Sequence, residues 1–289
     1  MEIVVASGKG GTGKTFIASN LLFYLHTYVS SSVGIDADAE APDLLLATGG
    51  SRKRLLSEEV YESRKAWIDV DRCTKCFRCV ENCVFGAIEI VDGYPRIDAV
   101  LCEGCGVCSY VCPAHCVELR QHLTGWIYVD ETNLGLYVVT SNLVVGGKAT
   151  GHLVYRAREV GKEFATQRSA KYIVIDAAAG IGCPVVSAIA GSNLVIVVVE
   201  PLPPSIQGAK RMVSLAQHFG IRVLGIVNKF DLDPETSRSL GDELGIEIVG
   251  YVPHSEIVAK SYAEMKPLLA YEPNHEVSKI LLDVFRSIA

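Results

Sequence analysis

The feature that most limits the fold is a glycine-rich segment that follows an apolar strand and opens a helix. Residues 2–6 form the strand-like run, and Gly8–Thr15 follows with the sequence GKGGTGKT. This fits the pattern G-x-x-x-x-G-K-[ST] in the structural context that the pattern requires. Glycines let backbone N–H groups wrap around phosphate oxygens, and the helix amino terminus adds a positive dipole end. The sequence therefore predicts a nucleoside triphosphate site.

Two side chains of this segment add chemistry of their own. Lys14 is expected to bridge the β- and γ-phosphate oxygens, and the Thr15 hydroxyl is suited to coordinate Mg²⁺. The predicted nucleotide contacts from the loop are Gly8, Lys9, Gly10, Gly11, Thr12, Gly13, Lys14 and Thr15.

The alternation of strands and helices predicts the fold class. Runs rich in Val and Ile recur at residues 33–36, 136–140, 172–176, 194–200, 223–228 and 246–251, and helical periodicities separate most of them. Such alternation implies right-handed crossovers and a mostly parallel, twisted sheet with helices on both faces. We therefore expect an α/β P-loop NTPase fold, interrupted between about residues 66 and 120. The flanks of this interruption are expected to be a polar connector at residues 48–54 and a hairpin at residues 125–135 that returns the chain to the sheet.

Composition excludes several classes of protein. The chain has 27 basic and 33 acidic residues, a formal net charge of −6, so no global positive field attracts nucleic acid. The first strand begins at the amino terminus and leaves no room for a secretion signal, which predicts a cytoplasmic protein. Two charge-free stretches, 16–35 and 177–199, contain too many polar, glycine and proline residues for membrane spans.

A second lysine within the phosphate loop, Lys9, narrows the family. With it the sequence resembles the deviant Walker A ATPases, which include MinD, ParA, the nitrogenase iron protein and the Mrp-type iron-sulfur carriers. The resemblance covers residues 1–65 and 121–289. It implies a homodimer, or a heterodimer with a related ATPase, in which Lys9 reaches the nucleotide of the partner subunit.

The same resemblance assigns roles to three aspartates. Asp36 and Asp38 end one strand in a pattern similar to switch I, and Asp176 ends another in a pattern similar to switch II. By this analogy Asp38 orients or deprotonates the attacking water, so Asp38, Lys14 and Lys9 are the expected catalytic residues. Thr15, Asp36 and Asp176 are the expected magnesium residues. Carboxyl ends of strands are where open α/β sheets place their ligands.

The base pocket leaves two nucleotides open. Asn228–Asp231 has the sequence NKFD and matches the guanine-recognition pattern N-K-x-D, in which the aspartate accepts from the base. In the family that this chain resembles, the equivalent asparagine usually contacts adenine. We therefore expect ATP with Asn228 as the contact, and GTP remains open. Residues 251–256 resemble the second base-side loop of the family.

The cysteines are concentrated in one short segment. Eight of the ten fall between Cys73 and Cys112, and the spacing C-x-x-C-x-x-C-x-x-x-C occurs twice, 29 residues apart. This resembles a bacterial-type ferredoxin, and predicts an inserted α+β ferredoxin domain over residues 66–120. In this motif the fourth cysteine of each run ligates the other cluster. The predicted [4Fe-4S] ligands are Cys73, Cys76, Cys79 and Cys112 for cluster I, and Cys102, Cys105, Cys108 and Cys83 for cluster II. Zinc is the competing interpretation.

Two cysteines remain. Cys116 is expected to be a buried structural thiol. Cys183 lies seven residues after Asp176, the offset of the shared-cluster cysteine in the nitrogenase iron protein. A bridging cluster needs a second such cysteine, and none occurs outside the insert, so a packed thiol of the switch loop is favoured.

The predicted function combines both motifs. ATP binding and hydrolysis are expected to drive dimer and switch changes coupled to electron transfer to, or maturation of, a redox or metalloenzyme partner. The alternative is a scaffold or carrier for iron-sulfur or metal-cofactor assembly. Membrane positioning would need a basic amphipathic helix near the carboxyl end, where acidic residues balance the basic ones, so stable membrane association is not expected.

Overall fold

The structure is a computed structural model that describes residues 1–147 and 151–288. The chain divides into two compact units. The first unit comprises Met1–Glu58, Ile127–Asn142 and Thr150–Ala289, and the second comprises Glu59–Trp126 and Leu143–Ala149, apart from the residues outside the described ranges. The segment predicted as a ferredoxin domain, 66–120, lies within the second unit.

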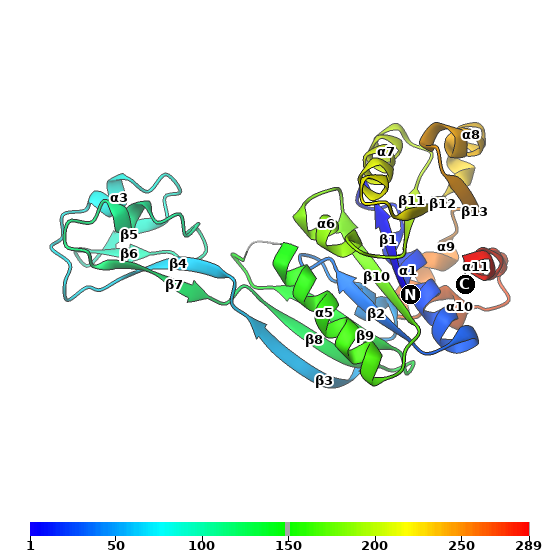
Figure 1. Cartoon of the computed structure of the whole chain (residues 1–289), viewed down its shortest axis with the longest axis horizontal. Helices are drawn as coiled ribbons and strands as arrows, with labels where there is room; N and C mark the ends of the chain where they lie inside the picture. The colour runs from blue at the N-terminus through cyan, green and yellow to red at the C-terminus, as the bar shows by residue number, and fades with distance from the viewer. Residues whose placement is uncertain (148–150, 289) are drawn as a thin grey trace. The chain divides into compact units, whose positions relative to one another are not determined.

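A twisted sheet forms the centre of the first unit (Figure 1). Among the described residues it has nine strands in the order β13-β12-β11-β1-β10-β2-β9-β8-β3. The six pairings from β13 to β9 are parallel, which confirms the expected α/β fold with a mostly parallel sheet. The strands are β1 (Glu2–Ser7), β2 (Ser32–Ala37), β3 (Ser51–Val60), β8 (Gly125–Thr132), β9 (Tyr137–Leu143), β10 (Tyr172–Ala179), β11 (Leu194–Val199), β12 (Arg222–Asn228) and β13 (Glu247–Val252).

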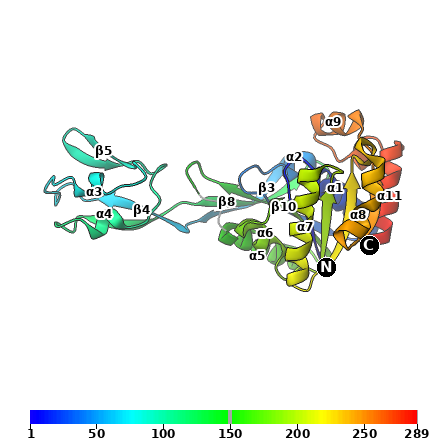
Figure 2. The ribbon, with the colours of Figure 1, turned by 90° about the horizontal axis from the view of Figure 1, so that it is seen from above.

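Helices cover both faces of this sheet because its central strands are apolar on both sides. On one face Ile3 and Val5 of β1 share a core with α1, α2, α10 and α11. On the other face α5 packs on β2, α6 on β10 and α7 on β11 (Figure 2). The helices are α1 (Lys14–Tyr24), α2 (Leu44–Ala47), α5 (Gly151–Gln167), α6 (Cys183–Ile189), α7 (Pro203–His218), α8 (Pro234–Leu244), α9 (Glu256–Ala263), α10 (Leu268–Tyr271) and α11 (Glu276–Ile288), with a π-helical turn at Leu25–Val29 and a 3-10 turn at Phe230–Leu232.

One prediction about the sheet edge is wrong. Residues 48–54 have the composition of a polar connector, but β3 begins at Ser51 and forms the edge strand. The charged side chains are stabilised there because Asp130, buried on neighbouring β8, accepts hydrogen bonds from Ser51 Oγ at 2.6 Å and Arg54 Nε at 3.2 Å. Charged residues are common on edge strands, where they discourage pairing with other chains. The hairpin expected over 125–135 is formed by β8 and its turn into β9.

The second unit is built from short antiparallel pairs. Strands β4 (Ser63–Ile68) and β7 (Val117–His122) pair with each other, as do β5 (Ile88–Val91) and β6 (Tyr94–Ile97). Two one-turn helices, α3 (Arg78–Glu81) and α4 (Val107–Tyr110), each carry the third cysteine of one repeat. A small core of apolar side chains and cysteines lies between these elements.

The carboxyl-terminal helix packs inside the first unit. Its apolar face, with Val277, Leu281, Val284 and Phe285, is buried in the core that α1 and the sheet share. Within the described ranges, no helix has both the length and the apolar character needed to cross a bilayer.

Candidate functional site

The phosphate loop lies between β1 and α1 and touches other segments closely. At Gly8, an added Cβ would lie 2.0 Å from the backbone carbonyl carbon of Gly208 on α7, so only glycine fits this contact. Gly13 has φ +94° at the start of α1, and a Cβ there would meet the Asn228 amide at 2.3 Å. At Gly10 and Gly11 a Cβ would meet nothing within 4 Å. The loop is thus fixed at its ends and open in its middle.

This opening is part of a cavity of about 820 Å³. Lys14, Thr15 and Asp38 line it together with the loop glycines 10, 11 and 13. Lys9 is exposed and does not line the cavity of its own chain. Ligand pockets are typically about 300–1,000 Å³, so the space suits a nucleotide.

Thr15 lines this cavity and contacts the buried Asp176. Thr15 Oγ1 donates to Asp176 Oδ2 at 2.5 Å. Asp176 Oδ1 is buried and, among the described residues, has no hydrogen-bond partner. Burial raises the pKa of Asp176 to about 7. A buried carboxylate oxygen without a donor carries an energetic cost that a cation or its bound water would remove.

Asp36 has a different environment from the one its predicted role suggests. It is the register partner of Asp176 on the neighbouring strand, and it is fully buried. Its Oδ1 accepts from the Asp38 amide at 3.1 Å and its Oδ2 from the Leu44 amide at 2.8 Å. Burial, and then the nearby Asp176 carboxyl, raise the pKa of Asp36 well above its usual range. Its observed contacts therefore order the loop that carries Asp38, and its magnesium role stays a prediction.

Asn228 closes the cavity from β12. Its Nδ2 donates to the carbonyl of Thr12 in the phosphate loop at 2.8 Å. The next residue, Lys229, has φ +53° and donates through Nζ to Glu200 at 2.6 Å and to the Gly11 carbonyl at 3.4 Å. These contacts link the ends of β11 and β12 to the phosphate loop. Asn228 lines the cavity, and its contact with a base stays a prediction.

Comparison with known proteins identifies the family. A model of the CobQ/CobB/MinD/ParA nucleotide binding domain matches residues 3–268. The chain belongs to this family. An uncharacterized ATP-binding protein of Methanocaldococcus jannaschii is 30% identical over 299 residues, which cover 97% of this chain and 96% of the relative.

Two further matches concern the fold and a shorter segment. The structure of MinD from Pyrococcus horikoshii in complex with Mg-ADP superposes with a TM-score of 0.62 at 15% identity, over 99% of this chain and 95% of that one. A stretch of 64 residues, 22% of this chain, is 33% identical to 10% of the IorA subunit of indolepyruvate oxidoreductase from Methanothermobacter marburgensis.

In this MinD/ParA-type chain the segment after β13 forms part of the cavity wall. Pro253, His254 and Ser255 lie where the sequence indicated a second base-side loop. The cavity is also lined by residues of α9 that no sequence motif indicated, among them Val258, Ala259 and Tyr262. Their spacing of three and four residues is the signal for one helix face. That this face lines the cavity depends on tertiary packing.

Asp231, which the pattern N-K-x-D assigns to guanine, has another contact. Its Oδ1 accepts from the backbone amide of His254 at 2.6 Å, and Asp231 is not among the residues that line the cavity. The carboxylate therefore joins the turn after β12 to the loop after β13. This oxygen is occupied by the protein's own backbone.

The cysteines of the second unit surround two separate small cavities. One is lined by Cys73, Cys76, Cys79 and Cys112, together with Cys116. The other is lined by Cys83, Cys102, Cys105 and Cys108. The structure thus brings together the two sets of four that the sequence assigned, including the exchange of the fourth cysteine between repeats. Within the described residues, no three His, Cys, Asp or Glu side chains form a group placed to hold a single metal ion.

The backbone of the two repeats is duplicated as well. Left-handed residues occur in pairs 29 residues apart, at Lys75 and Gly104, Phe77 and Gly106, and Gly86 and His115. Three of these six positions are not glycine, so this conformation is not visible in the sequence. Successive turns of this kind direct backbone N–H groups toward a common centre. The Lys75 amide donates to Cys73 Sγ and the Ala66 amide to Cys102 Sγ, each at 3.4 Å.

Cys116 and Cys183 differ in exposure. Cys116 is buried, as expected, and its Sγ lies 3.5 Å from Cys112 Sγ. Burial, and then the contact with Cys112, raise the pKa of Cys116 to about 12. At Cys112 burial also acts to raise the pKa, but hydrogen bonds from Cys116 outweigh it, so the pKa of Cys112 is lowered. Cys183 is exposed at the start of α6, so the expectation of a packed thiol is wrong. It is the first residue of α6, whose buried residues are Val185, Ala188 and Ile189.

Proposed function

We propose that this chain is an ATPase whose nucleotide cycle controls a domain carrying two [4Fe-4S] clusters, for electron transfer to, or maturation of, a redox or metalloenzyme partner. The observation that carries the proposal is the arrangement of eight cysteines as two sets of four, each around its own cavity, in a chain with a P-loop.

The cysteine cavities fit cubane clusters in ligand number and type. A [4Fe-4S] cluster takes four thiolates, and in the two-cluster motif the fourth cysteine of each run belongs to the other cluster. In a cubane each thiolate binds a different iron, so the sulfurs surround a cluster and need not converge on one ion. Zinc requires such convergence, with Zn–S distances of about 2.3 Å. The amides that donate to Cys73 and Cys102 are the kind of contact that sets cluster potentials.

ATP is the nucleotide that the contacts favour. Recognition of guanine needs a free carboxylate at Asp231, and its Oδ1 accepts from the His254 amide instead. Asn228 remains at the cavity wall as the expected contact to adenine. Mg-ADP bound to the Pyrococcus horikoshii MinD agrees with an adenine nucleotide.

Hydrolysis would use residues that line the cavity or contact its wall. Lys14 and the loop amides would hold the phosphates, and Asp38, which lines the same cavity, would orient the attacking water. Mg²⁺ would neutralise developing charge, held by Thr15 and by Asp176, whose buried Oδ1 is available. Asp36 would keep the Asp38 loop ordered through its two backbone contacts.

Coupling to the clusters needs two states with different affinity for a partner. We infer that Lys9, exposed and outside its own cavity, contacts the nucleotide of a second subunit, so that ATP binding closes a dimer and hydrolysis reopens it. The partner would be a redox protein or metalloenzyme in the cytoplasm, consistent with the 64-residue similarity to an oxidoreductase subunit.

The test uses anaerobically purified full-length protein. We expect about eight irons per chain and Mg-dependent ATP hydrolysis whose rate differs between oxidised and dithionite-reduced samples. Asp38→Ala should bind ATP and hydrolyse it at least about a hundredfold more slowly, while the exposed Asp242→Ala on α8 should hydrolyse at the normal rate.

Each part of the proposal has its own contrary outcome. Iron-free, colourless protein would reject the clusters. An ATP hydrolysis rate that is the same in oxidised and reduced samples would reject the coupling. Rapid transfer of iron and sulfide to an apo-acceptor protein would favour the carrier function instead.

A further inference from the structure

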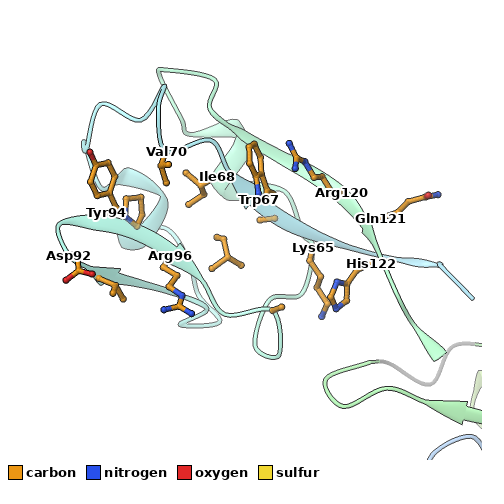
Figure 3. Close-up of a pocket in the computed structure, with 15 residues that line it drawn as sticks. Lys65, Trp67, Ile68, Val70, Asp92, Tyr94, Arg96, Arg120, Gln121 and His122 are labelled. Carbon is orange, nitrogen blue, oxygen red and sulfur yellow. The ribbon is translucent and has the colours of Figure 1, made fainter. Parts of the chain in front are cut away.

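The second unit contains a cavity that neither cysteine set explains. It has a volume of about 590 Å³ and lies beside β4, β6 and β7. Figure 3 shows Trp67 and Lys65 from β4, Arg120 and His122 from β7, and Tyr94 and Arg96 from β6 around this space. Its size is in the range of small-molecule pockets, about 300–1,000 Å³.

The charged side chains of this cavity favour an anion. Lys65, Arg96 and Arg120 line it, and among the described residues of its wall Asp92 is the single acidic one. Lys65 is only 8% exposed, and its Nζ donates to the Cys102 carbonyl at 2.6 Å and to the Gly146 carbonyl at 3.2 Å. Burying an ammonium group is costly unless it is well hydrogen-bonded. The two carbonyl contacts therefore hold the Lys65 ammonium in place.

Aromatic rings lie next to these cations. The Arg120 guanidinium carbon is 3.3 Å from the centroid of the Trp67 ring, and the same side chain donates to Glu118 at 3.3 Å. Trp67 is 39% exposed and Tyr94 is 37% exposed. Large aromatic side chains left exposed at a concave, basic surface suit a flat ring that carries a negative group.

The wall of the cavity is shared with both cysteine sets. Ala66 and Ile97 also line the cavity of Cys83, Cys102, Cys105 and Cys108, and Ile68 and Pro95 also line the cavity of Cys73, Cys76, Cys79 and Cys112. A molecule bound here would therefore be separated from each set by a single layer of side chains.

We propose that this cavity binds a planar aromatic anion, of the class of flavin phosphates and carboxylated quinones, next to both cysteine sets. Arg96 and Arg120 contact the anionic group and Trp67 supports the ring. The redox meaning of this position rests on the proposed function, whereas binding itself does not.

The probe is flavin mononucleotide, and riboflavin is the matched molecule without the phosphate. Equilibrium dialysis is done anaerobically on the full chain with oxidised clusters and saturating Mg-ADP, which fills the nucleotide cavity. We expect flavin mononucleotide to bind at least about tenfold more tightly than riboflavin. Arg96→Gln and Arg120→Gln should each lower the affinity for flavin mononucleotide about three- to tenfold and leave the affinity for riboflavin unchanged.

The control variant is Arg286→Gln, an exposed arginine of α11 that should not alter binding. The proposal is overturned if the two flavins bind with equal affinity or if neither flavin binds. It is also overturned if neither cavity substitution changes the affinity for flavin mononucleotide. Iron is measured on the same samples. Iron-loaded protein that binds no flavin rejects this inference alone, and iron-free protein that binds it in the expected pattern rejects the proposed clusters alone.

Discussion

Asp36 and Asp176 are register partners at the carboxyl ends of adjacent parallel strands, and both are buried. Their oxygens have different contacts. Asp36 accepts hydrogen bonds from two backbone amides, those of Asp38 and Leu44. Asp176 accepts a hydrogen bond from the Thr15 hydroxyl, and its other oxygen is buried without a partner among the described residues. One aspartate therefore orders a loop, and the other contacts Thr15, a residue of the cavity wall.

This difference predicts a pH dependence for nucleotide-free, Mg-free protein. Because burial raises the pKa of Asp176 to about 7, the folded chain holds a proton that the unfolded chain loses above about pH 4. The unfolding free energy should therefore fall as pH rises from about 4 to about 7 and then level off. Asp176→Asn should lack this contribution, which is on the order of 4 kcal/mol at most. Denaturant unfolding of the normal protein and the variant at pH 5 and pH 8 checks this prediction. If their unfolding free energies differ by the same amount at both pH values, the prediction is contradicted.

The contact between Gly8 and Gly208 predicts a strong effect of one methyl group. Gly8→Ala places a Cβ 2.0 Å from the α7 backbone, which must then move. We expect a loss of about 1–3 kcal/mol in unfolding free energy, together with weaker ATP binding. Gly10→Ala is the control, because its Cβ would meet nothing within 4 Å, and it should stabilise slightly, by about 0.5 kcal/mol. Equal stability of the two variants in urea would argue against the close contact.

Asp231 should support the base-side loop without selecting the base. Asp231→Ala removes the acceptor of the His254 amide, so the loop after β13 loosens and ATP affinity should fall about three- to tenfold. The ratio of ATP to GTP affinity should not change. Asp231→Asn keeps an acceptor oxygen and should restore ATP binding. Selective loss of GTP binding in this second variant, measured by calorimetry, would instead assign Asp231 to guanine.

The two neighbouring thiols Cys112 and Cys116 should differ in their effect on iron. Cys112→Ser removes a predicted ligand, and iron should fall from about eight to about four per chain. Cys116→Ser removes the group that contacts Cys112 Sγ at 3.5 Å, so iron content should be kept while the reduction potential of one cluster shifts. Iron analysis and anaerobic redox titration test both. Halved iron in the Cys116 variant would mean that the ligand set is wrong.

Lys9 should act only in the dimer. Lys9→Ala should bind Mg-ATP with nearly the normal affinity, because the side chain is exposed and does not line its own cavity. Its ATPase rate per chain should be low and independent of protein concentration, while the normal protein should gain activity as concentration rises. Light scattering with ATP measures the dimer directly. A tenfold loss of ATP affinity in the variant would place Lys9 at its own nucleotide.

Several features followed from the sequence because they depend on short-range spacing. The P-loop, the strand ends with their aspartates and the cysteine repeat are each contained in a few consecutive residues, where residue type and spacing limit the chemistry. The apolar strands likewise predicted a buried parallel sheet. The edge strand β3 was not predicted because its charged residues are typical of a connector. The strand is stabilised by a contact between Arg54 and Asp130, which lie 76 residues apart in the chain.

Tertiary packing decided the rest, since it depends on which distant segments meet. The sequence alone determined that a phosphate loop and eight cysteines in two repeats share this chain. Only the structure showed that Asp231 holds the His254 loop, that Cys183 is exposed and that a basic, aromatic cavity adjoins both cysteine sets. The hydrogen-bond partner and the exposure of a side chain are set by packing between segments far apart in the chain, which no local pattern contains.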